Sequence, residues 1–145
     1  MENTAAGICL AAALVGAGCA SAQAPSQVKA PLENTYWKLV QLGDAAVAGV
    51  HGSREPHVIL HPDSRRVTGS GGCNRLTGSY ELMGDQLSFE RMAATMMACQ
   101  DGMDTEQAFL EALKQVHKTR ITRQQLELLD AAGNGVARFE AVYLK

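Results

Sequence analysis

The residues of this chain whose types are best suited to catalysis or binding lie in two neighbouring runs. Residues 69–80 read GSGGCNRLTGSY, with four glycines around Cys73 and Asn74. Residues 92–99 read MAATMMAC and supply a further cysteine, Cys99. We interpret the two runs as one constellation. Their residue types suggest phosphate binding, thiol catalysis, soft-metal binding or recognition of a carboxylate.

The glycines do not match a phosphate-binding loop. Such a loop ends in Gly-Lys-Ser or Gly-Lys-Thr and leads directly into a helix, and this run does neither. Gly71 and Gly72 instead indicate a positive φ angle or a close approach between two backbones. Asn74 tolerates the left-handed region and can bond to its own backbone. We therefore predict a tight crossing in a small barrel.

A cysteine nucleophile needs a neighbouring base and a third group that orients the base. The chain has four histidines: His51, His57, His61 and His117. No local signature joins any of them to Cys73 or Cys99. We therefore expect no catalytic residue, and we interpret the histidines as surface or strand-edge residues.

A soft metal such as Cu(I) would suit thioether and thiolate donors. The candidates are Met92, Met96, Met97, Met103 and Cys99. Methionine more often fills irregular gaps in a core. Zinc would need convergent ligands, and no spacing here provides them. We expect no metal and no cofactor.

Arg75 follows the glycine bend and offers a rigid guanidinium to a carboxylate. That carboxylate would belong to a ligand in a binding site. In the simpler interpretation, which we favour, a salt bridge to Glu81 or Asp101 pins the loop after Cys73.

Length and charge limit the class of protein. The chain has 145 residues, 46% of them hydrophobic and 19% charged, with a formal net charge of -2. This is enough for one folded domain, and disorder over the whole length is not expected. No basic patch indicates a nucleic-acid partner.

Residues 1–23 are predicted to be an export segment. The apolar run at 5–20 is shorter than the roughly 20 residues that span a bilayer, and it suits the core of a secretion signal. Residues 14–20 resemble a lipobox, in which Cys19 would be lipidated. Against this, Gly16 stands where leucine is usual, and no lysine or arginine precedes the run.

A plain signal peptide cleaved near residues 20–22 is therefore the alternative. Either way we expect an exported protein of the periplasm. If Cys19 carries lipid, the protein is anchored to the outer membrane.

The cysteines divide along the same boundary. Cys9 and Cys19 belong to the export segment, which leaves Cys73 and Cys99 for the folded domain. In an oxidising compartment we expect these two to form a disulfide, and two buried free thiols are the alternative. The closed loop of about 25 residues would contribute roughly 3 kcal/mol in the chain-entropy model.

Short strands must position these residues. Residues 24–34 are predicted to be a linker, and the domain then covers 35–145. Alternating patterns between turn residues predict strands at 36–42, 57–60, 66–70, 76–82, 86–89, 120–122, 125–129, 136–140 and 141–144. The run 92–99 is predicted to be a strand or an irregular part of the core, and 132–135 a hairpin turn.

One helix is predicted after Asp104, its expected N-cap, with Gln107 as the capping-box partner and an end near 117–119. Its buried stripe is expected to be Ala108, Phe109, Ala112, Leu113 and Val116. Its solvent side is expected to be Glu106, Glu111, Lys114, Gln115 and Lys118. The fold class is α+β: a small antiparallel barrel-like sheet with one packed helix.

The two runs at 69–80 and 92–99 resemble the META domain, also called HslJ-like. Trp37-Lys38-Leu39 and the pair Glu106 and Phe109 extend the resemblance, which covers 34–145. The chain departs from the family where Thr95-Met96-Met97 replaces a frequent Thr-Arg-Met.

The resemblance implies a β-rich domain with one helix in the bacterial envelope, often a lipoprotein, with links to heat stress and to novobiocin tolerance. It implies no enzyme activity and no cofactor. It also implies a structural role for the motif residues Gly72, Cys73, Asn74, Gly78, Thr95 and Cys99. We add Gly71 and Arg75 to this structural motif.

The sequence thus favours a monomeric, non-enzymatic envelope protein with a structural or partner-binding role under stress. Its partner would be an envelope protein or an outer-membrane component. Two alternatives remain open: a carrier of an apolar ligand in the barrel interior, and a thiol-dependent enzyme.

Overall fold

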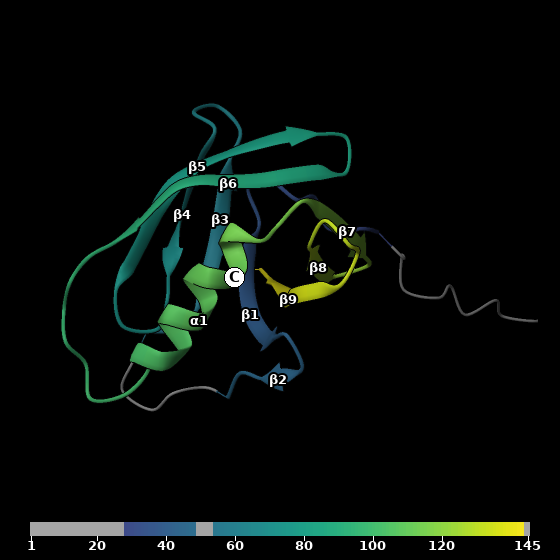
Figure 1. The fold of residues 1–145 in the computed structure, drawn as a ribbon. Coiled ribbons are helices and arrows are strands. Elements are labelled where there is room, and N and C mark those ends of the chain that lie inside the picture. Colours follow the sequence, from purple (N-terminus) through teal and green to yellow (C-terminus); the bar gives the residue numbers. More distant parts are fainter. Residues whose placement is uncertain (1–27, 49–53, 144–145) are drawn as a thin grey trace, which may run out of the picture.

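The chain forms a small β-barrel with one helix packed against it (Figure 1). The computed structural model describes residues 28–48 and 54–143, so Cys19 and the rest of the predicted export segment lie outside it. Its elements are β1 (Tyr36–Leu42), β2 (Ala45–Ala46), β3 (His57–His61), β4 (Arg66–Ser70), β5 (Arg75–Met83), β6 (Gln86–Ala94), α1 (Met103–Lys114), β7 (Lys118–Thr122), β8 (Gln125–Leu129) and β9 (Gly135–Val142).

The strands close into a ring. Their order is β2-β1-β3-β4-β5-β6-β7-β8-β9, and a further pairing joins β1 to β9. All pairs are antiparallel, and β2 lies outside the ring as an extension of β1. Closure gives nearly every strand two neighbours and so hides the backbone groups that an open edge would expose. The predicted α+β barrel-like architecture is confirmed.

Inward-facing side chains fill the ring. In β1 and β3 the buried residues alternate with partly exposed ones, as expected for strands with one face in a core. The largest fully buried side chains are Trp37, Tyr80, Phe109, Phe139, Leu39, Leu60, Leu76, Leu87, Leu113, Leu126, Leu128 and Val58. Every strand of the ring except β4 and β7 supplies at least one of them, and β4 supplies Val67, which is also fully buried, so a single core holds the sheet together.

The helix packs against β1, β6 and β9 (Figure 1). Phe109 and Leu113 are fully buried on its inner side. The ring of Phe109 lies 5.8 Å from that of Phe139 in β9, tilted by 50°. Aromatic pairs at this separation add to the energy of apolar burial, so this contact couples the helix to the barrel.

The start of the helix differs from the prediction. The N-cap is Gly102, with φ of 90°, and no side chain caps the first turn. Its carbonyl accepts the N–H of Glu106 at 3.0 Å. Because glycine adopts positive φ at little cost, the chain turns into the helix without a polar cap. The predicted N-cap role of Asp104 is therefore wrong, although its charge suits the first turn.

The helix is also shorter and faces differently than predicted. It ends at Lys114, where the N–H of Gln115 donates to the Ala112 carbonyl at 3.1 Å and the N–H of Val116 donates to the Leu113 carbonyl at 3.4 Å. Ala108, predicted to be buried, is exposed, whereas Glu106, predicted to face solvent, is only 5% exposed. The remaining members of the predicted stripe are buried, which confirms its general direction.

The strands agree with the sequence at most positions, and the main differences are in β2, β6, β7 and β9. β7 begins at Lys118, two residues before the predicted start. β6 continues to Ala94, and the chain then runs along the surface, where Met96 and Met97 are 98% and 55% exposed. Of the run predicted to be a strand or an irregular core segment over 92–99, residues 92–94 are strand, and both interpretations are wrong for 95–98. β2 was not predicted, and β9 runs unbroken from Gly135 to Val142 after the predicted turn.

The segment before β1 is held on the barrel. Ala30 is buried, and the Trp37 indole N–H donates to the Leu32 carbonyl at 2.8 Å. The phenol of Tyr80 in β5 donates to the Glu33 carboxylate at 2.5 Å. Residues 28–34, assigned to the linker from sequence, thus contribute contacts to the domain.

Replacing Phe109 with alanine should lower the free energy of unfolding by about 3–5 kcal/mol, because it removes a fully buried ring and its contact with Phe139. Glu111→Ala, on the exposed side of the same helix, should change it by less than about 0.5 kcal/mol. Chemical denaturation of the oxidised protein measures both. Equal changes in the free energy of unfolding for the two variants would show that the helix is not part of the core.

Burial, followed by the hydrogen bond and charge of Glu33, raises the pKa of Tyr80 from 10.0 to about 12. The unfolded chain therefore loses this proton at lower pH than the folded one. The resulting stabilisation is complete below pH 10 and is lost as the pH rises from 10 to about 12. Tyr80→Phe should show a smaller loss of stability over that range in denaturant titrations, and an unchanged loss would contradict this.

Candidate functional site

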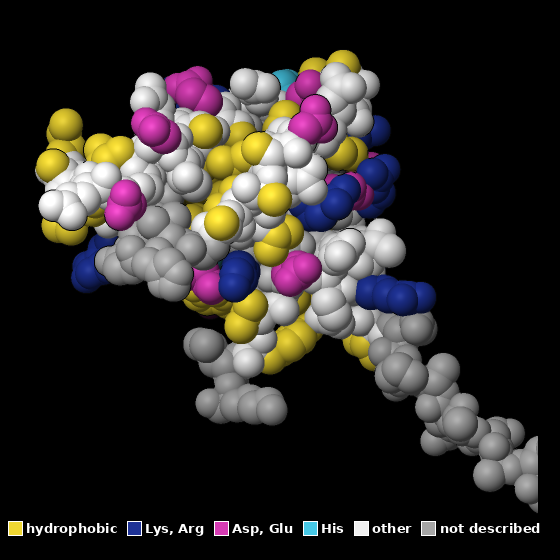
Figure 2. Space-filling model, turned by 90° about the horizontal axis from the view of Figure 1, so that it is seen from below, with side chains coloured by type: hydrophobic (Ala, Val, Ile, Leu, Met, Phe, Trp, Pro, Cys, Tyr) yellow, Lys and Arg dark blue, Asp and Glu magenta, His cyan; other side chains and the backbone are white. Residues whose placement is uncertain are grey.

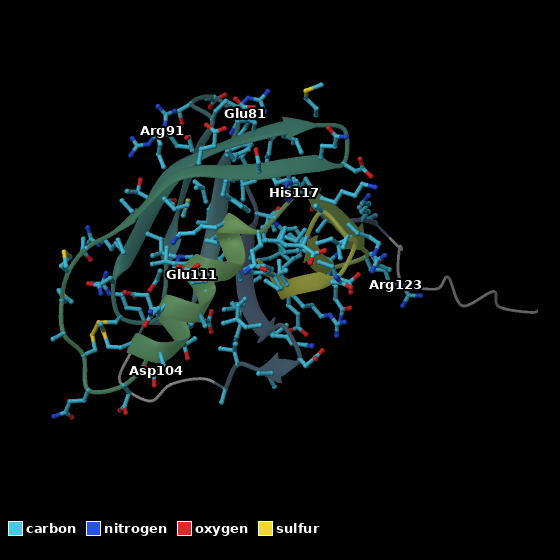
Figure 3. The ribbon with its side chains drawn as sticks, viewed as in Figure 1. Glu81, Arg91, Asp104, Glu111, His117 and Arg123 are labelled. Carbon is cyan, nitrogen blue, oxygen red and sulfur yellow. A yellow bond between two sulfur atoms is a disulfide. The ribbon has the colours of Figure 1, made fainter. Side chains whose placement is uncertain are left out.

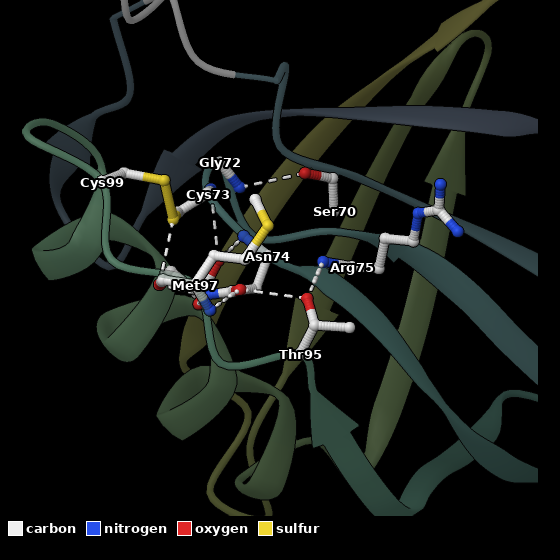
Figure 4. Close-up of a disulfide and its surroundings, with 9 residues drawn as sticks. Ser70, Gly72, Cys73, Asn74, Arg75, Thr95, Met97 and Cys99 are labelled. Atoms are coloured by element: carbon white, nitrogen blue, oxygen red, sulfur yellow. Dashed lines mark hydrogen bonds between the residues drawn. A yellow bond between two sulfur atoms is a disulfide. The ribbon is translucent and has the colours of Figure 1, made fainter.

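The two motif runs meet beside the first turns of α1 (Figure 4). Between the end of β4 at Ser70 and the start of β5 at Arg75 the chain makes a sharp bend. The Gly71 N–H donates to the Asn74 carbonyl at 3.0 Å, and the Gly72 N–H donates to the Ser70 hydroxyl at 3.2 Å. Gly72 has φ of 114°, which confirms the predicted need for glycine there.

Gly71 is required for a different reason. A Cβ atom at this position would lie 2.6 Å from Oε2 of Glu106 and close to two further atoms of that side chain. Gly78 in β5 is similar, since a Cβ there would lie 3.0 Å from the Glu90 carbonyl oxygen and against Met92. The register of β5 and β6 shifts at this point. Both glycines therefore permit close packing, as the structural interpretation of the motif predicts.

Cys73 and Cys99 form a disulfide across the site (Figure 4). Their Cα atoms are 5.9 Å apart, a separation typical of such bonds. Cys73 is only 3% exposed. The predicted disulfide is confirmed, and the alternative of two free thiols is wrong.

The amide of Asn74 joins the bend to the segment after β6. Its Oδ1 accepts the Thr95 hydroxyl at 3.0 Å and the Met97 N–H at 2.7 Å. Its Nδ2 donates to the Met97 carbonyl at 3.2 Å and to Oε1 of Glu106 at 2.7 Å. All four hydrogen-bonding positions of this buried side chain are used.

The carboxylate of Glu106 is the centre of the site. Its Oε2 accepts the backbone N–H groups of Cys73 at 3.2 Å and Asn74 at 2.5 Å. Its Oε1 accepts the Asn74 side-chain amide. Hydrogen bonds to an ionised acceptor are stronger than neutral ones, so this buried carboxylate fixes the bend to the helix.

Glu106 was missed as a site residue by periodicity, because a charged residue in an amphipathic helix is normally assigned to solvent. Its partners lie 32 and 33 residues earlier in the chain, and no local pattern links them to it. The sequence feature that could have identified Glu106 is the family resemblance, because it includes Glu106 together with Phe109.

Thr95 and Arg75 complete the site through the backbone. The Arg75 N–H donates to the Thr95 hydroxyl at 3.1 Å, and the Thr95 N–H donates to the Arg75 carbonyl at 3.1 Å. The Arg75 residue is exposed, and no salt bridge joins it to any described carboxylate. The predicted pairing with Glu81 or Asp101 is therefore wrong.

The methionines are exposed rather than packed at this site. Met96, Met97 and Met103 are 98%, 55% and 42% exposed, whereas Met92 packs partly on the core. The interpretation of all four as core fillers is therefore wrong for three of them. All three lie within four residues of Cys99 in sequence, and we call this exposed apolar group the methionine margin (Met96, Met97 and Met103).

The described histidines lie in ordinary surface environments. The ring of His57 stacks on Tyr36 at 4.2 Å, His61 bonds to the Thr68 hydroxyl, and His117 bonds to the Gln115 carbonyl. His51 lies outside the described residues. Within 28–48 and 54–143, no group of three or more histidine, cysteine or acidic side chains is arranged to hold a metal ion. The helix that the structure describes is not long and apolar enough to cross a membrane.

The sequence model of a family described as META domain matches residues 30–143. An NMR structure of a protein from Burkholderia xenovorans is similar, with a TM-score of 0.64 and 30% identity over 78% of this chain and 85% of that chain. A second NMR structure has a TM-score of 0.58 and 22% identity over 75% of this chain and 90% of that chain, which shows the fold alone. No curated protein matches.

Glu106→Gln should lower the free energy of unfolding by about 3 kcal/mol, because a carboxylate that accepts three N–H groups is replaced by an amide that must turn a donor toward one of them. Glu111→Gln, on the exposed side of α1, is the matched control and should change it by less than about 0.5 kcal/mol. Urea denaturation measures both. Equal losses would show that the buried carboxylate is dispensable.

Proposed function

The chain belongs to the META domain family, and on that premise we propose that it is a non-enzymatic protein of the bacterial envelope that binds an envelope partner under stress. The disulfide between Cys73 and Cys99 is the observation that carries the proposal. Such bonds persist in oxidising compartments. The apolar run at residues 5–20 supplies the route of export, and lipid on Cys19 would anchor the protein to the outer membrane.

The internal bonding of the motif residues supports a role without catalysis. The polar side-chain atoms of Asn74, Thr95 and Glu106 form hydrogen bonds with one another and with the backbone. A thiol-dependent enzyme needs a free thiolate, whereas the sulfur of Cys73 is bonded to Cys99. The motif therefore supports a scaffold that shapes the surface around it.

The filled interior gives the apolar-carrier alternative little support. The inward positions of the barrel are occupied by side chains such as Trp37, Leu60 and Phe139, which are not exposed at all. One cleft among the described residues has a volume of about 400 Å³, and its lining is mixed: the charged Glu81, Lys118 and Asp130 stand beside Met83 and Leu87. A carrier of acyl chains would need an apolar cavity of comparable size.

The methionine margin supports the partner-binding form of the proposal. Its three side chains are large, apolar and exposed. Asn74 holds the backbone of Met97, the disulfide holds Cys99 two residues later, and Met103 begins α1. Unbranched thioether side chains adapt to apolar surfaces of different shape. An exposed apolar group on a fixed backbone suits an apolar segment of an envelope protein.

The proposal is tested by photo-crosslinking in a bacterium that expresses the full chain. A photoreactive residue at position 96 should capture an envelope protein, whereas the same residue at position 83, which is 75% exposed on the β5–β6 turn, should not. Trapping of free thiols during lysis should leave Cys73 and Cys99 unmodified, because they are oxidised in the envelope.

Two results would contradict the proposal. One is recovery of the chain from the cytoplasm with both cysteines modified by the thiol reagent. The other is equal capture at positions 96 and 83, which would show that the methionine margin has no special affinity for a partner.

A further inference from the structure

The chain enters the folded domain at the turn between β7 and β8. The Val28 carbonyl accepts the side-chain amide of Gln124 at 2.9 Å, and the Ala30 N–H donates to the Arg123 carbonyl at 2.8 Å. In Figure 1 the first described residues, drawn in purple, lie beside these strands. The described part of the chain therefore starts at a defined point on the surface of the domain.

The surface around this point is basic. Lys29 and Arg123 are exposed. On the adjoining strands Arg120 and Arg138 lie 2.7 Å and 3.3 Å from the carboxylate of Glu127, so two cations share one anion. In Figure 2 Lys and Arg side chains gather on the right of the molecule, which is the side of β7 and β8 in Figure 1.

Two exposed apolar residues border the same turn. Val28 is 66% exposed and Tyr143 is 61% exposed. The Tyr143 phenol donates to the Gln124 side chain at 2.5 Å, which places the aromatic ring beside the entry point. Tyrosine suits the boundary between water and lipid because one end of its ring is polar.

We define the entry face by six residues: Val28, Lys29, Arg120, Arg123, Arg138 and Tyr143. Three acidic groups lie near these four cations. Glu127 is shared by two arginines, Glu140 lies opposite Gln125 in the β8–β9 pairing, and Asp44 lines a cleft with Glu127 and Arg138. The entry face therefore carries an excess of positive charge together with two exposed apolar side chains.

We propose that the entry face docks the domain on the surface of a bilayer through anionic lipid headgroups. This rests on the proposed envelope function, because that function places the chain beside a membrane. If Cys19 is lipidated, the chain from Cys19 to Val28 spans at most about 30 Å, so the anchor keeps the entry face within reach of the headgroups. Cations near an anionic surface are attracted to it, and salt screens the attraction.

The test uses the full chain with Cys19→Ser, so that no acyl chain contributes, and vesicles of phosphatidylcholine with or without 30% phosphatidylglycerol. Phosphatidylglycerol should raise vesicle binding about tenfold, and 0.5 M salt should abolish the increase. The double variant Lys29→Glu with Arg123→Asn should lose most of it. Asparagine is chosen because position 123 has φ of 57°.

The matched control is Arg66→Glu with Arg91→Asn, which changes the net charge equally, and position 91 has φ of 50°. Figure 3 shows Arg91 and Arg123 on different sides of the molecule. The control should bind as the parent protein does. Equal binding by the entry-face variant and its parent, or an equal loss in the control, would overturn the proposal.

A second measurement does not depend on any variant. Paramagnetic lipid headgroups should broaden the amide signals of residues 28–30 and 120–124 more than those of β5, and uniform broadening would overturn the proposal. Neither vesicle experiment depends on export. A protein recovered from the cytoplasm would therefore refute the proposed function separately from the docking surface.

Discussion

The structure depends on one buried carboxylate. Glu106 accepts three N–H groups from the bend that links β4 to β5, and those bonds join the helix to the strands. A buried charge is tolerated only when it is paired or fully hydrogen-bonded. The carboxylate reaches the N–H groups of the bend only because residue 71 is a glycine, since a Cβ there would collide with the Glu106 side chain. The side chain of Asn74 in turn accepts the Met97 N–H, and this bond fixes the segment that carries Cys99.

The disulfide and this polar network hold the same two segments, and they act at different levels. The disulfide limits the conformations of the unfolded chain. The bonds of Glu106 and Asn74 act in the folded state, where they select one position of the methionine margin. The exposed residues on this margin are thus set on a rigid support. In this account the residues that resemble a reactive site serve to present a surface.

Much of the fold could be predicted because its signals are local. The strands at 36–42, 66–70 and 125–129 end where predicted, since alternation and turn residues both mark them. The disulfide followed from counting the cysteines outside the predicted export segment. The details that failed depend on contacts distant in sequence. Met97 is exposed because Asn74 holds its backbone at the surface, and nothing within the apolar run indicates this.

The amide protons of Cys73, Asn74 and Met97 offer the most direct test of the central claim. In the oxidised protein their hydrogen exchange should require global unfolding, with the same free energy as the slowest amides of the barrel core. Rapid exchange of these amides through local opening, while the core remains protected, would contradict the claim that a buried carboxylate fixes the site.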